Sequence, residues 1–215
     1  MDYLGQPLKR FEDARLLTGK GLFIDDIKLQ GMLYAVVVRS IHAHAWIRSI
    51  DTSGAIGLAG VVDVLTGRDL KGVLSNIPIR EMGDRSVDEF NPPGHPVLAQ
   101  DKVCYVGQPV AVVVADDPYL ARDGAESVIV EYDVLTPVIV PEQAANLETP
   151  IIHADIGTNV AIRSIQEGGD IERAFTEADH VVRQRYQIQR LAPSSIEGRG
   201  VVADYNSSED FLTVW

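Results

Sequence analysis

Histidine and cysteine are the residues of this chain whose spacing could bind a metal ion. His42 and His44 are two positions apart, so on a β-strand both side chains would point to one side, a spacing that some metal sites use. A metal also needs further ligands, and Cys104, His95 and His153 stand at no matching spacing. We therefore predict a structural role for the two histidines and no metal-binding residue.

Glycine and serine form no complete motif for phosphate binding or hydrolysis. Residues 18–21 contain Gly-Lys but lack the rest of the G-x-x-x-x-G-K-[ST] phosphate loop, and no G-x-G-x-x-G follows a strand. Ser194 and Ser195 lack the G-x-S-x-G turn that exposes a hydrolase nucleophile. The sequence therefore argues against a nucleotide-binding protein and against a serine hydrolase.

Two pairs of adjacent aspartates have a simpler explanation than catalysis. Asp116 and Asp117 precede Pro118, which is the pattern of a helix N-cap followed by proline in the first turn. Asp25 and Asp26 precede a turn, and a general acid or base role for them is the minor alternative. We predict no catalytic residue among these acids.

Glu197 is the acid whose surroundings are most distinctive. It follows the small and apolar run at residues 191–196 and precedes Gly198-Arg199-Gly200. Such a carboxylate is expected to be partly buried and to form an ion pair with Arg199 or with a cation of a partner. The alternative is a position on the wall of a substrate or cofactor cavity, so Glu197 is the one candidate for contact with a cofactor.

Composition places the chain among ordinary globular proteins. It has 215 residues, of which 46% are hydrophobic and 23% charged, and a formal net charge of −12. This charge repels nucleic acids and anionic membranes. The single cysteine cannot form an internal disulfide or hold an iron–sulfur cluster, which fits a reducing, cytoplasmic location. The first residues of the sequence lack the basic and apolar pattern of a secretory leader, and no apolar run is long enough to span a membrane.

The first two thirds of the chain alternate between apolar strands and short helices. Strands are predicted at residues 33–38, 42–50, 61–65, 110–115 and 128–132, and helices at 53–59 and 119–127. Because the joints around the second helix are short, the strand–helix–strand unit at 110–132 favours a parallel crossover. Residues 75–96, rich in proline, glycine and charge, are predicted to form a long surface loop.

The remainder reads as a second, incomplete unit beyond about residue 145. A linker at 137–150 contains a short helix at 142–146, and Asp170 caps a helix at 171–178. A long strand at 182–189 would bury one apolar face, and further strands follow at 201–205 and 210–215. The last strand has no turn or cap after it, so we expect its neighbour to lie in residues beyond this chain or in a second chain.

Six segments, in this order, resemble the start of the large, molybdenum-binding subunit of the xanthine dehydrogenase, aldehyde oxidase and aerobic carbon monoxide dehydrogenase family. They are RFEDARLLTGKGLFIDD at residues 10–26, VRSIHAHA at 38–45, HPVLA at 95–99, YVGQPVA at 105–111, GTN at 157–159 and GDIERAF at 169–175. Their joint order and spacing cover nearly the whole chain. The chain departs from the family pattern Met-Glu-Pro-Arg-Gly, reading Ile-Glu-Gly-Arg-Gly at 196–200; glycine in place of proline loosens the backbone at Glu197.

The resemblance implies an α+β fold, in which an α/β hammerhead domain is followed by an incomplete mixed α/β molybdopterin-binding domain. The implied organisation is an N-terminal arm at 1–18, the hammerhead domain at 19–135, a linker at 136–150 and the start of the cofactor-binding domain at 151–215. In the family, oxygen from water is inserted into a C–H bond or CO is oxidised, and electrons pass through [2Fe–2S] clusters to FAD.

The resemblance also implies that the cofactors lie outside this chain. The family's catalytic glutamate and its glycine-rich pterin loops have no counterpart here, so we expect the chain alone to bind no cofactor and to be inactive. The implied partners are the remainder of the large subunit, an iron–sulfur small subunit and an FAD-binding medium subunit. One alternative is a separately encoded hammerhead module that docks without catalysing; another is a truncated gene product.

Overall fold

The computed structural model describes residues 3–79, 87–146 and 148–215. These residues pack as two compact units, of which the larger is Leu33–Val181 and the smaller combines Met1–Met32 with Val182–Trp215.

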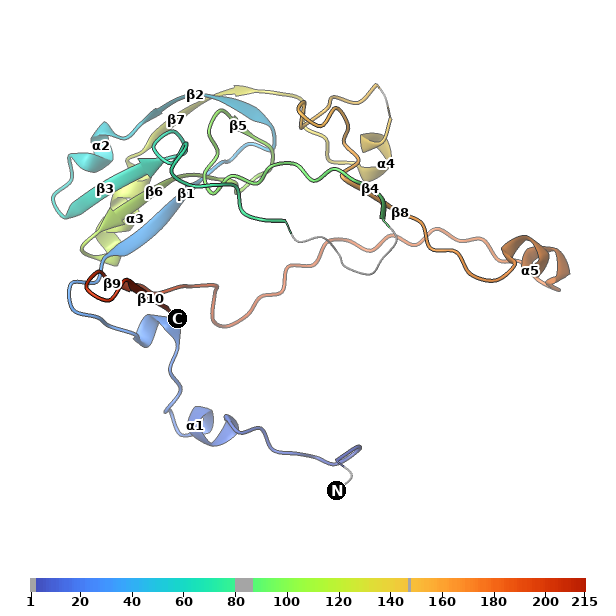
Figure 1. Ribbon diagram of the computed structural model, residues 1–215, viewed down its shortest axis with the longest axis horizontal. Coiled ribbons are helices and arrows are strands. Elements are labelled where there is room, and N and C mark those ends of the chain that lie inside the picture. The colour runs from blue at the N-terminus through green and yellow to red at the C-terminus, as the bar shows by residue number, and fades with distance from the viewer. Residues whose placement is uncertain (1–2, 80–86, 147) are drawn as a thin grey trace. The chain divides into compact units, whose positions relative to one another are not determined.

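A three-stranded antiparallel sheet organises the larger unit. Its order is β1 (Tyr34–Arg39), β6 (Pro109–Ala115), β3 (Val61–Thr66), so β6 is the central strand (Figure 1). Tyr34 and Val61 both stand opposite Ala115, which sets the register on the two sides of β6. The predicted strands at 33–38, 61–65 and 110–115 are therefore confirmed with small shifts at their ends.

The strand that follows α3 belongs to a second antiparallel sheet and not to the predicted parallel crossover. Its order is β5 (Lys102–Val103), β2 (Ala45–Asp51), β7 (Ile129–Val134). The crossover is wrong because β1 and β3 occupy both edges of β6, so β7 pairs with β2 instead. The strand predicted at 42–50 begins only at Ala45, which leaves His42 and His44 in the preceding loop.

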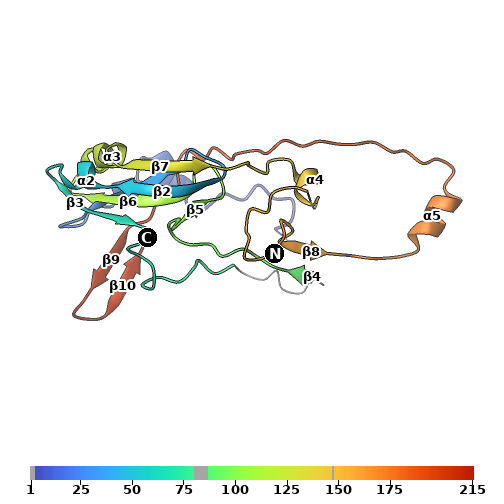
Figure 2. The same cartoon turned by 90° about the horizontal axis from the view of Figure 1, so that it is seen from above.

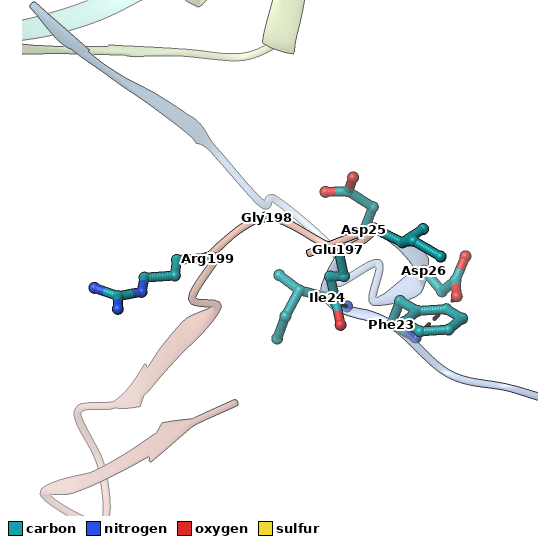
Figure 3. Close-up of a pocket in the computed structure, with 9 residues that line it drawn as sticks. Phe23, Ile24, Asp25, Asp26, Glu197, Gly198 and Arg199 are labelled. Carbon is teal, nitrogen blue, oxygen red and sulfur yellow. Dashed lines mark hydrogen bonds between the residues drawn. The ribbon is translucent and has the colours of Figure 1, made fainter. Parts of the chain in front are cut away.

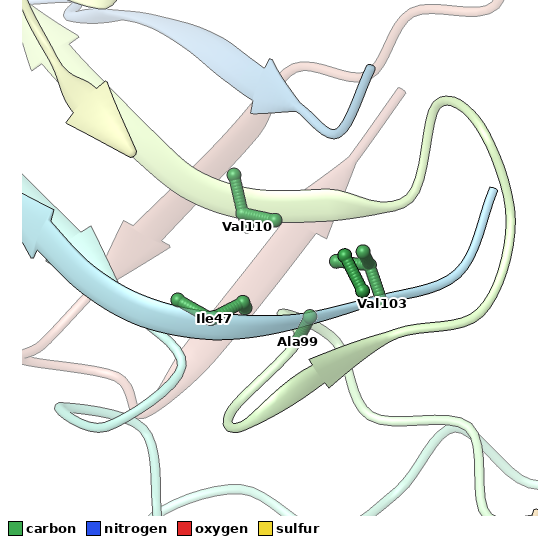
Figure 4. Close-up of a cluster of buried hydrophobic side chains, with 5 residues drawn as sticks. Ile47, Ala99, Val103 and Val110 are labelled. Atoms are coloured by element: carbon green, nitrogen blue, oxygen red, sulfur yellow. The ribbon is translucent and has the colours of Figure 1, made fainter. Parts of the chain in front are cut away.

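The core of the larger unit lies between these elements as two touching clusters of small apolar side chains. The first is Ala45, Ile47, Ala99, Val103 and Val110 (Figure 4), and the second is Ala55, Val64, Val113 and Val128. Val38, Ile50 and Val130 pack against both clusters and so join them. In Figure 2 the strands of the two sheets are stacked in layers, with α2 (Ser53–Ile56) and α3 (Pro118–Glu126) beside each other at one end.

The start of α3 confirms the predicted cap. The Asp117 carboxylate accepts a hydrogen bond from the backbone N–H of Tyr119 at 2.8 Å, and Pro118 occupies the first turn. A side chain at Gly124 would place its Cβ 2.8 Å from Cγ1 of Val113. Glycine at this position therefore allows α3 to lie directly on β6.

Smaller elements complete this unit. β4 (Val87–Phe90) pairs antiparallel with β8 (Ile162–Ser164), so the predicted loop at 75–96 is wrong where β4 forms; residues 80–86 of that loop lie outside the described residues. The predicted short helix in the linker is α4 (Pro141–Ala144). α5 (Ile171–Glu177) begins with the Asp170 carboxylate accepting the N–H of Arg173 at 3.0 Å, as predicted.

The smaller unit contains little regular structure. The predicted N-terminal arm contains a short helix, α1 (Asp13–Leu17), and a single 3₁₀ turn, η1 (Ile24–Asp26), follows it. The strand predicted at 182–189 is wrong, because these residues form no strand and Tyr186 and Ile188 are 78% and 87% exposed. Period-two alternation makes a strand only where a sheet covers the apolar face, and nothing among the described residues covers it.

The last strand has a partner within the chain, contrary to expectation. β10 (Phe211–Val214) pairs antiparallel with β9 (Ala203–Asn206), and the N–H of Trp215 donates to the carbonyl of Val202 at 2.9 Å. The polar turn between the strands is held by Asn206, whose Oδ1 accepts the N–H of Ser208 at 3.1 Å. Among the helices of the described residues, none is long and apolar enough to cross a membrane.

The cap of α3 gives a direct test of this fold. Replacing Asp117 by alanine should lower the free energy of unfolding by about 1 kcal/mol, because two helical N–H groups lose their acceptor. Urea unfolding followed by circular dichroism measures the loss. Asp116→Ala is the matched control, since its carboxylate does not cap the helix; equal losses for the two variants would contradict the assignment.

Candidate functional site

Glu197 lies in the wall of a shallow concavity of about 410 Å³ within the smaller unit. Residues 23–26 and residues 196–200 form its two sides (Figure 3). Only the fold brings these two segments together, because they stand more than 160 residues apart in a chain of 215.

A hydrogen bond from backbone to carboxylate joins the two sides. The N–H of Ile24 donates to Oε1 of Glu197 at 2.9 Å. The turn that presents this N–H is closed by Asp26, whose Oδ2 accepts the N–H of Phe23 at 2.9 Å. Gly200 also lies close to this turn, since a Cβ at its position would be 3.0 Å from Cγ2 of Ile24. Glu197 therefore fastens the 196–200 segment onto η1.

The expected ion pair between Glu197 and Arg199 does not form. Figure 3 shows the Arg199 side chain pointing away from the carboxylate, and no salt bridge joins the two among the described residues. Glu197 is also exposed rather than partly buried. Its actual partner is a backbone N–H 173 residues away, for which the sequence carries no signal.

The two histidines of the predicted structural pair do not converge on one point. The His42 ring meets the Tyr132 ring edge-on, with centroids 5.0 Å apart. His44 is only 5% exposed and its Nδ1 lies 2.8 Å from the carbonyl oxygen of Thr136. Within the described ranges, no three histidine, cysteine or acidic side chains group as metal ligands.

Several titratable side chains of the larger unit influence one another although they lie far apart in the sequence. Burial raises the pKa of the Cys104 thiol, with the nearby Lys102 ammonium acting in the opposite direction. Burial also lowers the pKa of His153; Lys102 and His44 add to this effect and Asp155 opposes it. A thiol with a raised pKa is a poor nucleophile at neutral pH.

Comparison with known families identifies both parts of the chain. The family model described as "Aldehyde oxidase and xanthine dehydrogenase, a/b hammerhead domain" matches residues 18–136. The model described as "Molybdopterin cofactor-binding domain" matches residues 152–215.

Individual relatives extend over nearly the whole chain. It is 40% identical to the 6-hydroxypseudooxynicotine dehydrogenase complex subunit gamma of Paenarthrobacter nicotinovorans, over 99% of this chain and 27% of that protein. It is 37% identical to the carbon monoxide dehydrogenase large chain of Afipia carboxidovorans, over 99% of this chain and 27% of that protein. The quinoline 2-oxidoreductase structure from Pseudomonas putida 86 superposes with a TM-score of 0.87 at 34% identity, covering all of this chain and 27% of its own. The chain thus spans about a quarter of the length of these relatives.

The concavity around Glu197 does not fit a molybdopterin. That cofactor carries a phosphate group, which needs cationic side chains or several free N–H groups around it. The walls carry the carboxylates of Asp25, Asp26 and Glu197 against the single guanidinium of Arg199, and Glu197 already accepts the Ile24 N–H. The charge and the hydrogen bonding of this site thus favour a structural contact over cofactor binding.

The contact between Glu197 and Ile24 can be measured. Glu197→Ala should speed hydrogen exchange of the Ile24 amide by about fivefold, because the amide loses its acceptor. Glu197→Gln should stay close to the wild type, since its side-chain carbonyl still accepts a hydrogen bond. Glu209→Ala, an exposed acid of the same unit, is the control. Exchange of Ile24 that is unchanged in Glu197→Ala would rule out the contact.

Proposed function

Because this chain belongs to the aldehyde oxidase and xanthine dehydrogenase family, we propose that it is the N-terminal portion of the large subunit of a molybdenum hydroxylase. The observation that carries the proposal is the order of the two family models, with the hammerhead at 18–136 followed by the cofactor-binding model at 152–215. The relatives that align over 99% of this chain are subunits of oxidoreductases, and the alignment uses only 27% of their length.

The domain organisation that we propose follows the same order. It consists of an arm at 1–18, the hammerhead domain at 19–135, a linker at 136–150 and the beginning of the cofactor-binding domain at 151–215. The two family matches support these limits. The packing divides the chain at other positions, because Met1–Met32 forms one compact unit with Val182–Trp215, and Leu33–Val181 forms the other.

In the intact enzyme, the bound molybdenum cofactor would supply the two-electron oxidation of substrate. We propose that a C–H bond is hydroxylated with oxygen from water, or CO is oxidised, and that electrons leave to [2Fe–2S] and FAD groups in partner subunits or domains. The residues of this chain would contribute folding and docking. The exposed apolar side chains of Tyr186 and Ile188, together with the outer edges of the β9–β10 hairpin, offer contact area for the remainder of the subunit.

One observation favours a second candidate, a separately encoded hammerhead module that docks without catalysing. The larger unit has its own continuous core, which a free-standing module requires. The coding sequence after Trp215 distinguishes the two: a continuous reading frame containing glycine-rich pterin loops supports the first, and a stop codon followed by a neighbouring gene that starts with such loops supports the second.

The proposal predicts where molybdenum binds. The purified 215-residue chain should contain molybdenum and iron far below one atom per chain, because the acidic Glu197 site does not accept an anionic cofactor. A longer protein that extends over the full length of the relatives, expressed with its partner subunits, should contain stoichiometric molybdenum. Elemental analysis of both preparations makes the comparison. Stoichiometric metal in the short chain, or none in the long one, would contradict the proposal.

A further inference from the structure

The larger unit extends past the boundary between the two family matches. It covers Leu33–Val181, whereas the hammerhead model ends at residue 136 and the cofactor-binding model begins at residue 152. Residues 148–164, which we call the strap, belong mostly to the second match by sequence but to the hammerhead by packing. Contacts at both ends of the strap and in its middle account for this difference.

The beginning of the strap is tied to the β5-β2-β7 sheet. The Lys102 ammonium donates to the carbonyl oxygen of Ile152, and it lies 5.3 Å from the centroid of the Trp46 ring, which is a cation–π contact. Lys102 is held in place by its neighbour in β5, Val103, which is completely buried in the core. The hydrogen bond therefore joins a residue of the hammerhead match to the first residue of the cofactor-binding match.

The end of the strap is part of a sheet. It contains β8, which pairs antiparallel with β4, and the two strands lie side by side in Figure 1 and in Figure 2. Arg163 stands opposite Glu89, and their charged groups are 3.7 Å apart. The N–H of Asn91 extends the ladder, because it donates to the carbonyl oxygen of Ala161 at 2.7 Å. The last residues of the strap are thus fixed to a segment of the hammerhead match.

Asn159 closes the strap between these two ends. Its Oδ1 accepts the N–H of Ile152 at 2.9 Å, and its amide nitrogen donates to the carbonyl oxygens of Ala144 at 3.2 Å and Pro150 at 3.0 Å. Because an N–H only donates and a carbonyl oxygen only accepts, these partners need a side chain that does both. An ionised aspartate could accept from Ile152 but could not donate to the two carbonyls.

Apolar side chains add to the contact. Ile152, Ile156 and Ala161 of the strap share the walls of a concavity of about 210 Å³ with Pro93 and Val138 of the hammerhead and the chain that leaves it. All five side chains are half-buried, so the strap and the hammerhead each remove part of the other's apolar surface from water.

Such contacts end after β8. Residues 166–169 take part in no hydrogen bond or ion pair among the described parts of the chain. A Cβ at Gly168 would meet nothing within 4 Å, and Gly169 has a φ of +70°, a conformation that glycine adopts easily. The helix that follows, α5, buries no residue. A segment with so few contacts opens and bends at the lowest cost in free energy.

We propose that the strap is a fixed part of the hammerhead, positioned by Lys102 and Asn159, and that residues 166–169 are the joint about which the rest of the second region moves. The boundary for motion then lies after β8 and not in residues 136–150, which composition marks as the linker. The inference goes beyond the proposed enzyme activity, because it concerns only contacts within this chain.

Cleavage of the folded 215-residue chain by a glutamate-specific protease tests both parts of the proposal. Glu148 stands at the start of the strap and Glu167 in the joint, and both are exposed. Each rate is divided by the rate for a synthetic peptide of the same local sequence. The bond after Glu167 should then be cut about tenfold faster than the bond after Glu148, because the clasped backbone must open before a protease can bind it. Equal rates, or faster cutting after Glu148, would overturn the proposal.

A variant of Asn159 tests the clasp directly. Asn159→Ala should raise cutting after Glu148 about tenfold and leave cutting after Glu167 unchanged, because three backbone groups lose their partner. Asn146→Ala, an exposed asparagine of the same connection, is the matched control and should behave as the wild type. Hydrogen exchange of the Val113 amide in β6 should be the same in all these proteins, which separates opening of the strap from unfolding of the hammerhead.

A variant of Lys102 tests the tie to the sheet independently. Lys102→Met should raise cutting after Glu148 about fivefold, because the Ile152 carbonyl loses its donor while the methionine keeps the apolar stem. Lys71→Met, at an exposed position, should leave the rate unchanged. A wild-type rate after Glu148 in either Lys102→Met or Asn159→Ala would show that the residue does not position the strap, and the proposal would be wrong.

Discussion

The pairing of β6 on both edges is the constraint on which the rest of this fold depends. β6 accepts β1 on one side and β3 on the other, and Val110, Ala111, Val113 and Ala115 are completely buried. A strand so enclosed cannot take β7 as a neighbour, so the chain that leaves β6 through α3 must join a different sheet. That second sheet then packs against the core, and Lys102 of its edge strand β5 donates to the carbonyl oxygen of Ile152.

Local signals in the sequence predicted the local structure well. Asp117 before Pro118 and Asp170 after two glycines both cap the helices that they were expected to cap. These features depend on residues within one turn of each other, so the sequence contains all of their physics. The choice of sheet for β7 depended on which edges were already occupied, and this is a property of the whole topology rather than of residues 110–132.

The candidate site shows the same limit more sharply. The sequence predicted that Glu197 pairs with Arg199 or with a cation of a partner, whereas within this chain its carboxylate accepts the backbone N–H of Ile24. A backbone donor has no sequence signature, since every residue except proline carries one. Likewise the apolar alternation at 182–189 predicted a strand. Alternation shows which side chains a sheet would bury, but a strand forms only if a neighbouring strand is available to pair with it.

The two units thus differ in how many apolar side chains they bury. The larger unit buries two clusters of small apolar side chains, and its Lys102 donates a hydrogen bond to the carbonyl oxygen of Ile152. The smaller unit leaves Tyr186 and Ile188 exposed and places carboxylates where an anionic cofactor would need cations. Exposed apolar groups gain free energy only by burial against further protein. Together with the family membership, these exposed groups support our proposal that the smaller unit contacts the rest of a larger subunit.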